Sequence, residues 1–297
     1  MHTDRDIITR GNLTGSLWMI AAMAAFAVED TFIKLAATAL PVGQILMLFG
    51  GGGALIFALI ARRNDEPLYT AAVLSRPMRL RVIFEVTGRL FYVLAIALTP
   101  LSSATVILQA TPLVVVAGAA LVFGERVGPR RWLAVLIGLL GVLVIIRPGS
   151  DSFSPLSLLA VIGMLGFAGR DLASRAAPAS LGTAILGLYG FLSIVLAGGL
   201  IALWQGAPFV VIDPHSALWL AGTVISGVTA YTCLMKAMRT GEVSAVTPFR
   251  YTRLLFGIGL GVTLFSERLD AMMLLGCALI VLSGLFILWR GKRAGIN

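Results

Sequence analysis

Long apolar stretches dominate this sequence and constrain its fold more than any other feature. Ten of them, each close to 20 residues long, follow one another with short connections: residues 14–37, 41–61, 81–99, 102–123, 131–147, 155–171, 181–204, 216–236, 243–265 and 270–290. A helix needs about 20 mostly apolar residues to cross a bilayer. The stretches are continuous rather than alternating, which argues against the strands of a membrane barrel. The sequence therefore predicts an all-α polytopic membrane protein with ten transmembrane helices.

Composition leads to the same class of protein. Hydrophobic residues make up 58% of the 297 residues and charged residues only 12%, whereas a soluble domain is about 45–50% apolar and about 25% charged. These values exclude a soluble globular domain, a disordered chain and a coiled coil. The two cysteines exclude a disulfide-rich secreted scaffold.

Basic residues are divided unequally between the two sides of the predicted membrane. If the N-terminus is cytoplasmic, only Arg147 and Arg268 of the 23 Lys and Arg fall in outer loops. Four lie inside the stretches, at least three residues from either end: Lys34, Arg89, Arg250 and Arg253. The other 17 lie on the inner side: Arg5, Arg10, Arg62, Arg63, Arg76, Arg79, Arg81, Arg126, Arg130, Arg131, Arg170, Arg175, Lys236, Arg239, Arg290, Lys292 and Arg293. An inner excess of this kind is the positive-inside signal, so the net charge of +9 indicates topology rather than nucleic-acid binding, and both termini are predicted to be cytoplasmic.

Two distant segments of the chain resemble each other. Residues 103–104 (Ser-Ala) match residues 244–245, and residues 123–126 (Phe-Gly-Glu-Arg) match residues 265–268 (Phe-Ser-Glu-Arg). The following stretch also carries small residues at related positions in both copies, and each copy closes on a basic residue. The sequence therefore contains an internal repeat.

This repeat divides the chain into two five-helix halves, residues 1–148 and 149–297, which form one integral membrane unit. An odd number of spans in each half predicts that the halves have opposite orientations in the membrane. Inverted repeats are frequent in secondary transporters, where the substrate site lies near the midplane between the halves.

The repeated loop motif also carries a family resemblance. Gly124-Glu125-Arg126, with Gly141 sixteen residues after the Glu, follows the fourth of ten short-looped helices. This pattern resembles the drug/metabolite transporter superfamily, specifically its EamA-domain branch, although the second copy has Ser266 where Gly is usual. Within that branch the chain is most similar to bacterial aromatic amino-acid exporters of the YddG type. The resemblance implies a transporter of the bacterial inner membrane, with a central cavity lined mainly by the third, fourth, eighth and ninth helices.

Ionisable residues within the stretches are the candidates for function, because each costs at least about 2.5–3.5 kcal/mol at a helix centre. Asp30 and Lys34 have i,i+4 spacing, as do Glu85 and Arg89, so each pair lies on one helix face. Either pair could be neutralised internally or could serve transport. Arg250 and Arg253 have no acidic residue in their stretch, so they require a carboxylate from elsewhere, a substrate anion or a path to the interface.

An amino acid is a substrate whose chemistry fits these groups. Arginine binds a carboxylate bidentately, a carboxylate can hold the ammonium, and aromatic faces can hold an apolar side chain. The candidate substrate-binding residues are Glu85, Arg89, Tyr92, Gln109, Tyr231, Phe249, Arg250, Tyr251 and Arg253. Glu29, Asp30 and Glu85 are candidate proton-coupling groups. Pro112 and Pro248 each favour a helix kink that could act as a hinge or be a static feature.

Motifs for enzymatic chemistry are missing from the sequence. The only histidines are His2 and His215, Cys233 and Cys277 are isolated, and H-E-x-x-H, G-x-S-x-G and G-x-x-x-x-G-K-[ST] do not occur. We therefore predict no enzyme, metal or cofactor, no nucleic-acid partner and no obligate protein partner. The prediction is a secondary transporter that exports amino acids, aromatic or apolar ones, by alternating access. The alternatives are export of another small metabolite or a cationic drug, and, more remotely, a membrane-embedded enzyme.

Overall fold

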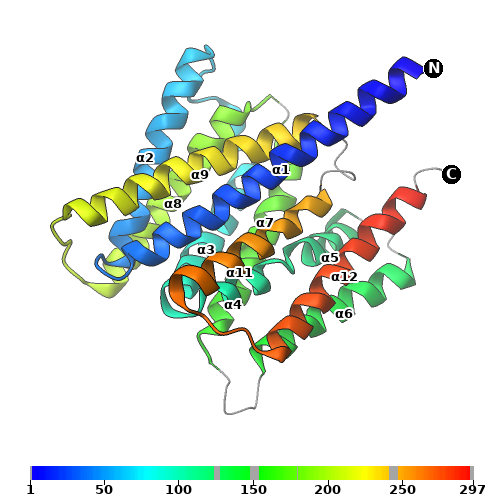
Figure 1. The fold of residues 1–297 in the computed structure, drawn as a ribbon. Coiled ribbons are helices and arrows are strands. Elements are labelled where there is room, and N and C mark those ends of the chain that lie inside the picture. Colours follow the sequence, from blue (N-terminus) through cyan, green and yellow to red (C-terminus); the bar gives the residue numbers. More distant parts are fainter. Residues whose placement is uncertain (1, 124–127, 148–153, 179, 241–246, 295–297) are drawn as a thin grey trace. The chain divides into compact units, whose positions relative to one another are not determined.

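The computed structural model describes residues 2–123, 128–147, 154–178, 180–240 and 247–294, and in these residues the chain is helical without strands. The helices are α1 (His2–Ala36), α2 (Val42–Arg63), η1 (Ala71–Leu74), α3 (Arg76–Leu98), α4 (Leu101–Leu108), α5 (Thr111–Phe123), α6 (Pro129–Ile146), α7 (Ser157–Arg175), α8 (Thr183–Gln205), α9 (Pro214–Thr240), η2 (Thr247–Tyr251), α11 (Thr252–Phe265) and α12 (Ala271–Ala294) (Figure 1). The all-α prediction is therefore confirmed for the described part of the chain.

Six described segments are long and apolar enough to cross a membrane: Leu13–Ala36, Val42–Arg63, Leu101–Val122, Ser157–Ser174, Thr183–Gln205 and Pro214–Ala237. Trp132–Ile146 and Ala271–Phe286 are shorter apolar helices. The helix α3 coincides with a predicted span but is less apolar, because it contains Arg81, Glu85 and Arg89.

The fourth predicted span is broken into two helices, α4 and α5. The break lies at Gln109 and Ala110, immediately before Pro112. A proline has no N–H to donate to the carbonyl four residues earlier, which here belongs to Leu108. The hydroxyl of Thr111 donates to that carbonyl instead, at 2.5 Å. Pro112 thus accompanies an interruption of the helix rather than a kink within a continuous one.

Two compact units make up the chain, and each combines segments from both sides of residue 148. Unit 1 consists of Met1–Val28, Thr105–Phe153 and Thr229–Asn297, and unit 2 consists of Glu29–Ala104 and Ser154–Val228. Three of the boundaries pass through helices, namely α1, α4 and α9.

In unit 2, α2 packs closely along α8 (Figure 1). Gly43 of α2 lies against Ala202 of α8, and Phe57 lies against Gly187. Residue numbers therefore rise along one helix and fall along the other, so the two are antiparallel. A Cβ at Gly43 would lie 2.7 Å from the backbone nitrogen of Ala202, which shows that small residues allow this approach.

The helices α3 and α7 form the second close pair of unit 2. Three glycines of α7 line the surface of α3: Gly163 lies against Tyr92, Gly166 against Gly88 and Gly169 against Phe84. This pair is also antiparallel, and its close contact brings the polar face of α3 next to α7.

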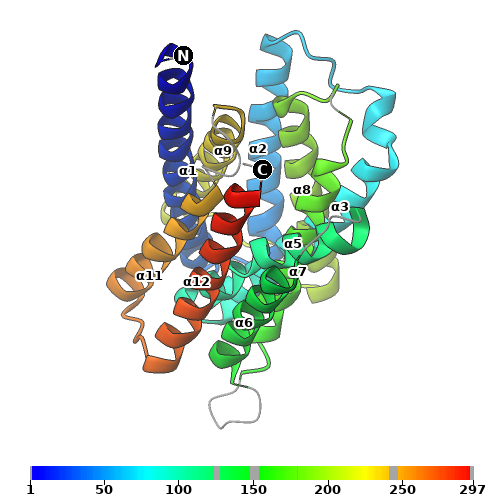
Figure 2. The same cartoon turned by 90° about the vertical axis from the view of Figure 1, so that its right-hand side faces the viewer.

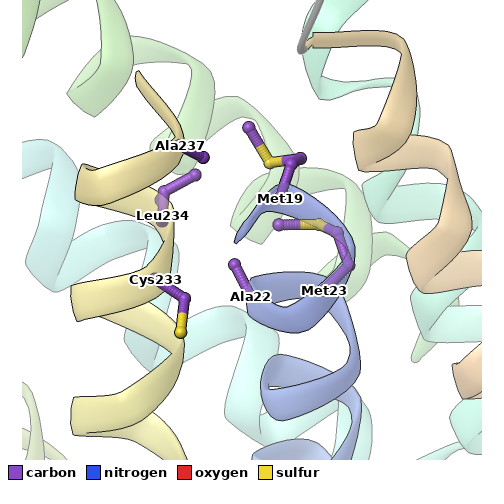
Figure 3. Packing of buried hydrophobic residues seen from close by; sticks show 6 residues of the cluster. All are labelled: Met19, Ala22, Met23, Cys233, Leu234 and Ala237. Atoms are coloured by element: carbon purple, nitrogen blue, oxygen red, sulfur yellow. The ribbon is translucent and has the colours of Figure 1, made fainter. Parts of the chain in front are cut away.

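In unit 1, α6 packs antiparallel to α12 (Figure 2). Gly138 lies against Ser283 and Gly141 against Ile280. A second contact joins α1 to α9 through a cluster of small and flexible side chains: Met19, Ala22, Met23, Cys233, Leu234 and Ala237 (Figure 3). Cys233 is thus a packing residue in this cluster.

An ion pair joins the end of α6 to the start of α12. Arg147 follows the last residue of α6 with a φ of 52°, and its guanidinium pairs with the carboxylate of Asp270. That carboxylate also accepts a hydrogen bond of 2.7 Å from the N–H of Met273 in the first turn of α12. The hydrogen bond from Arg147 is the largest cause of a lowered pKa of Asp270.

Removing this carboxylate is expected to destabilise the protein modestly and to change its response to acid. Asp270→Ala should lower the free energy of unfolding by about 1 kcal/mol, because a helix cap and a largely exposed ion pair are lost. Since the pKa of Asp270 is lowered by folding, its contribution is present at neutral pH and is lost as the pH falls below about 4. Thermal unfolding in detergent at pH 7 and pH 3 measures this. Arg268→Gln, in the same loop, should retain the wild-type pH dependence. If Asp270→Ala loses as much stability between pH 7 and pH 3 as the wild type does, the prediction is wrong.

Candidate functional site

A continuous set of polar contacts runs along one face of α3 in unit 2. We call it the polar ladder, and its residues are Arg81, Glu85, Arg89, Tyr92 and Thr99 on α3 and its C-cap, Arg170, Asp171 and Ser174 on α7, and Glu29, Asp30 and Lys34 on α1. Arg81 and Thr99 are 18 positions apart, about 27 Å along a helix at about 1.5 Å per residue. This length is close to the hydrocarbon thickness of a bilayer, about 30 Å.

Of the ladder's ion pairs described here, the one between Arg89 and Glu29 is the most buried. Nη1 of Arg89 lies 2.5 Å from Oε1 of Glu29, and the two side chains are 10% and 1% exposed. The guanidinium carbon of Arg89 is also 5.4 Å from the centre of the Phe49 ring and 5.7 Å from that of Phe167, within the range of cation–π contacts. A charge pair this well removed from water is strongly coupled, and it joins α1 to α3.

The next contacts toward the end of α3 involve Asp30 and Lys34. The hydroxyl of Tyr92 donates to Oδ2 of Asp30 at 3.2 Å. The ammonium of Lys34 donates to the carbonyls of Thr99 at 2.6 Å and Ile96 at 3.3 Å. Lys34 therefore caps the C-terminal end of α3, a role that its i,i+4 spacing from Asp30 did not predict.

Toward the start of α3, the ladder is formed with α7. Nη1 of Arg170 lies 3.4 Å from Oε1 of Glu85, and Nη2 lies 2.8 Å from Oδ1 of Asp171. Nε of Arg81 donates to the Ser174 hydroxyl at 3.0 Å. Four carboxylates and four basic groups thus balance in charge along the ladder.

The expectation that Glu85 and Arg89 could neutralise each other is wrong. Each pairs with a different helix, Glu85 with Arg170 of α7 and Arg89 with Glu29 of α1. If Glu85 paired with Arg89, then Glu29 would lose the guanidinium of Arg89 and Arg170 would lose the carboxylate of Glu85. Removing an opposite charge from a charged group inside the protein is costly. Arg170 itself was assigned only to the inner topology signal, and the structure places it in the ladder.

A second group of predicted residues lies in unit 1, around η2. The Gln109 side chain, at the break between α4 and α5, donates to the carbonyl of Arg250 at 3.0 Å. The guanidinium carbon of Arg253 lies 5.0 Å from the centre of the Phe26 ring, and Phe249 packs against the cluster of α1 and α9.

The remaining candidates of this group are placed by the same elements. Tyr251 is buried, with its ring against Gly284 of α12, and Tyr231 is half-buried on α9. Pro248 lies in η2, and Pro112 follows the break between α4 and α5. Each proline therefore lies at an irregular segment, and the hydrogen bond from Gln109 to Arg250 connects the two segments. The structure thus gathers the candidates into two groups, the ladder in unit 2 and the surroundings of η2 in unit 1.

The described residues contain no metal site, and the hollow found in unit 2 lies apart from the ladder. No group of three or more His, Cys, Asp and Glu in the described ranges is arranged to hold a metal ion. A hollow of about 560 Å³ in unit 2 is lined by residues of the α1–α2 turn and the end of α8, including Pro41 and Trp204, and no ladder residue lines it.

Comparison with known proteins identifies the family. The model of the EamA-like transporter family matches residues 13–147 and 155–289. The chain belongs to the EamA-like transporter family. The family assignment from the sequence is therefore confirmed, and this protein is a membrane transporter rather than an enzyme.

Curated relatives span nearly the whole chain. The pseudopaline exporter CntI of Pseudomonas aeruginosa is 29% identical over 276 residues, covering 91% of this chain and 94% of its own. A riboflavin transporter of Vibrio cholerae is 27% identical, and an S-adenosylmethionine uptake transporter of Rickettsia prowazekii is 22% identical, each covering 95% of both chains. A crystal structure with 21% identity and a TM-score of 0.62 covers 96% of this chain and 99% of its own, and it supports the fold. These relatives carry different metabolites in different directions, so membership alone does not define the substrate.

The family match also supplies a register between the two repeats. The two matched segments have equal length and begin at residues 13 and 155, 142 positions apart. In this register Glu29 corresponds to Asp171, so both repeats place a carboxylate of the ladder at the same position. Extending the internal repeat backward from the Glu-Arg motif would have revealed Asp171, and with it Arg170, from the sequence.

Proposed function

We propose that this EamA-family protein is a secondary transporter of the bacterial inner membrane that exports amino acids, preferably aromatic or apolar ones. In this proposal ten helices cross the membrane, both termini are cytoplasmic, and the halves at residues 1–148 and 149–297 are inverted relative to each other. Alternating access between the halves moves the substrate without ATP.

Antiparallel contacts between equivalent helices support the inversion. The repeat register pairs α2 with α8 and α6 with α12, and each of these pairs packs antiparallel within its own unit. Equivalent helices that meet antiparallel are related by a twofold axis perpendicular to them, as in inverted repeats. Gln109 and Arg250 are within one position of being equivalent, and their hydrogen bond is the contact expected near such an axis.

The charge-balanced ladder among aromatic rings is the observation that carries the substrate assignment. A zwitterion can bind with its carboxylate on a ladder arginine and its ammonium on a ladder carboxylate, so that the total charge stays zero. The ring of Phe167 lies next to both Arg89 and Arg170 and offers a surface for an apolar side chain. When the substrate leaves, the arginine and the carboxylate pair again, which keeps the empty carrier neutral.

The other candidates have supporting roles in this proposal. Glu29, Asp30 and Glu85 are proposed to exchange protons during the cycle, and Pro112 and Pro248 to mark hinges. The residues of the second group are proposed as further substrate-binding residues, carried by unit 1: Gln109, Tyr231, Phe249, Arg250, Tyr251 and Arg253.

Export of another metabolite or a cationic drug is the second candidate function. The relatives named for pseudopaline, riboflavin and S-adenosylmethionine favour a family site that adapts to different compounds. The ladder carboxylates Glu29, Asp30, Glu85 and Asp171 could bind a cation without an arginine, which distinguishes the two substrate classes.

Counterflow in proteoliposomes tests the proposed function. Vesicles loaded with unlabelled phenylalanine, tryptophan or leucine are expected to accumulate labelled phenylalanine well above protein-free vesicles. Loading with glutamate or with lipophilic amines should have little effect. Acceleration by the amines alone would favour the cationic substrate, and exchange by none of the amino acids would rule out the proposal.

A further inference from the structure

Two of the three ladder arginines, Arg89 and Arg170, share one aromatic ring but differ in their surroundings. Arg89 and Arg170 approach Phe167 with guanidinium carbons 5.7 and 4.8 Å from the ring centre. The Arg89 side chain is 10% exposed and lies 2.5 Å from Glu29. The Arg170 side chain is 21% exposed and lies 3.4 Å from Glu85. The contact of Arg170 with Glu85 is therefore the longer and more accessible of the two.

On this basis we infer that the contact between Arg170 and Glu85 is the substrate subsite, with Arg170 holding the carboxylate of an amino acid and Glu85 its ammonium. This inference rests on the proposed function and deepens it. Guanidinium offers five N–H donors in a planar fork, so Arg170 can keep Asp171 as a partner while it binds a substrate carboxylate. Separating the longer contact also disturbs fewer buried charges than separating Arg89 from Glu29.

The surroundings of this contact match the rest of an aromatic amino acid. Phe167 lies one turn from Arg170 on α7, and its ring meets that of Tyr92 edge to face at 5.8 Å. A substrate ring near Phe167 would join this aromatic pair in a favourable edge or stacked geometry. Gly163 and Gly169, which lie against Tyr92 and Phe84, hold α7 close enough to α3 for both charged groups to reach one substrate.

A pair of probes that differ only in the carboxylate tests the assignment. Phenylalanine and phenylalaninamide share the ring and the ammonium, but the amide has no negative charge. Arg170→Gln is expected to lower kcat/KM for phenylalanine by about 10- to 100-fold, the usual effect of a lost charge-assisted hydrogen bond. Exchange of the amide should change less than about threefold. Glu85→Gln should lower kcat/KM for both probes, because both carry the ammonium.

Two further variants separate binding from folding. Arg79→Gln removes an exposed arginine from the first turns of α3 and should leave both probes unchanged. Arg170→Lys keeps the charge without the fork and should show an intermediate, phenylalanine-selective loss, which decides the case if Arg170→Gln does not fold. If the Arg170 variants lose kcat/KM equally for both probes, or for neither, the subsite assignment is wrong. If the wild-type protein exchanges no amino acid, the proposed function fails, and the subsite fails with it.

Discussion

Arg89→Gln is expected to lower the free energy of unfolding by about 3–5 kcal/mol, the usual cost of breaking a buried ion pair from one side. The variant leaves the Glu29 carboxylate, 1% exposed, without the guanidinium that lies 2.5 Å away. It also removes the contacts of that guanidinium with the rings of Phe49 and Phe167. Unfolding of the detergent-solubilised protein measures the loss, and transport should fall to background because this buried ion pair between α1 and α3 is lost.

The double variant Glu29→Gln/Arg89→Gln separates stability from function. Two neutral amides can hydrogen-bond to each other, so we expect the free energy of unfolding to return to within about 1 kcal/mol of the wild-type value. Counterflow exchange should recover with it. Uptake driven by a proton gradient should not recover, because glutamine at position 29 cannot carry a proton.

Arg79→Gln, on an exposed part of the same helix, is the matched control and should change neither stability nor transport. Equal stability of Arg89→Gln and the double variant would contradict the coupling between Arg89 and Glu29. Full proton-driven transport by the double variant would remove Glu29 from the proposed proton-coupling groups.

The second large effect is expected at the contact between α7 and α3. A Cβ at Gly166 would lie 2.5 Å from Cα of Gly88 and 3.0 Å from the carbonyl oxygen of Phe84. Backbone atoms cannot rotate away as a side chain can, so Gly166→Ala forces the two helices apart. We expect the free energy of unfolding to fall by about 2–3 kcal/mol, at the upper end for overpacking. The transport rate should also fall, because Arg170 and Glu85 face each other across this contact.

The same substitution at Gly199 of α8 provides the comparison. A Cβ at Gly199 would meet no atom within 4 Å, and alanine is favoured over glycine inside a helix by up to about 1 kcal/mol. Gly199→Ala should therefore be neutral or slightly stabilising, with normal transport. If Gly166→Ala and Gly199→Ala have the same effect on unfolding, the close packing of α7 on α3 does not limit stability.

Much of the helical architecture could be predicted from the sequence because continuous apolar runs have one stable solution in a bilayer. Each of the ten stretches coincides with one or two helices wherever the structure describes them. Interruptions were harder to place: Pro112 indicated an irregularity, but the end of α4 at Leu108 depends on a hydrogen bond from Thr111. Such a local exchange of partners leaves almost no signal in hydropathy.

Most candidate residues could be identified from the sequence, because an ionisable group stands out in an otherwise apolar stretch. The partners of those residues could not be identified in this way. Spacing along α3 allowed a pair between Glu85 and Arg89, whereas the structure pairs them with Arg170 and Glu29. Spacing describes one helix at a time, and the ion pairs of this protein join different helices.

The sequence by itself therefore determined the class of protein, its helices, its internal repeat and the inventory of charges within the apolar stretches. Apolar length and residue type are local properties, and the bilayer acts on each stretch separately. Only the tertiary structure decided how those charges combine into the polar ladder. The glycines of α7 allow α3 to approach so closely that a residue assigned to the topology signal, Arg170, becomes a partner of Glu85 inside the protein.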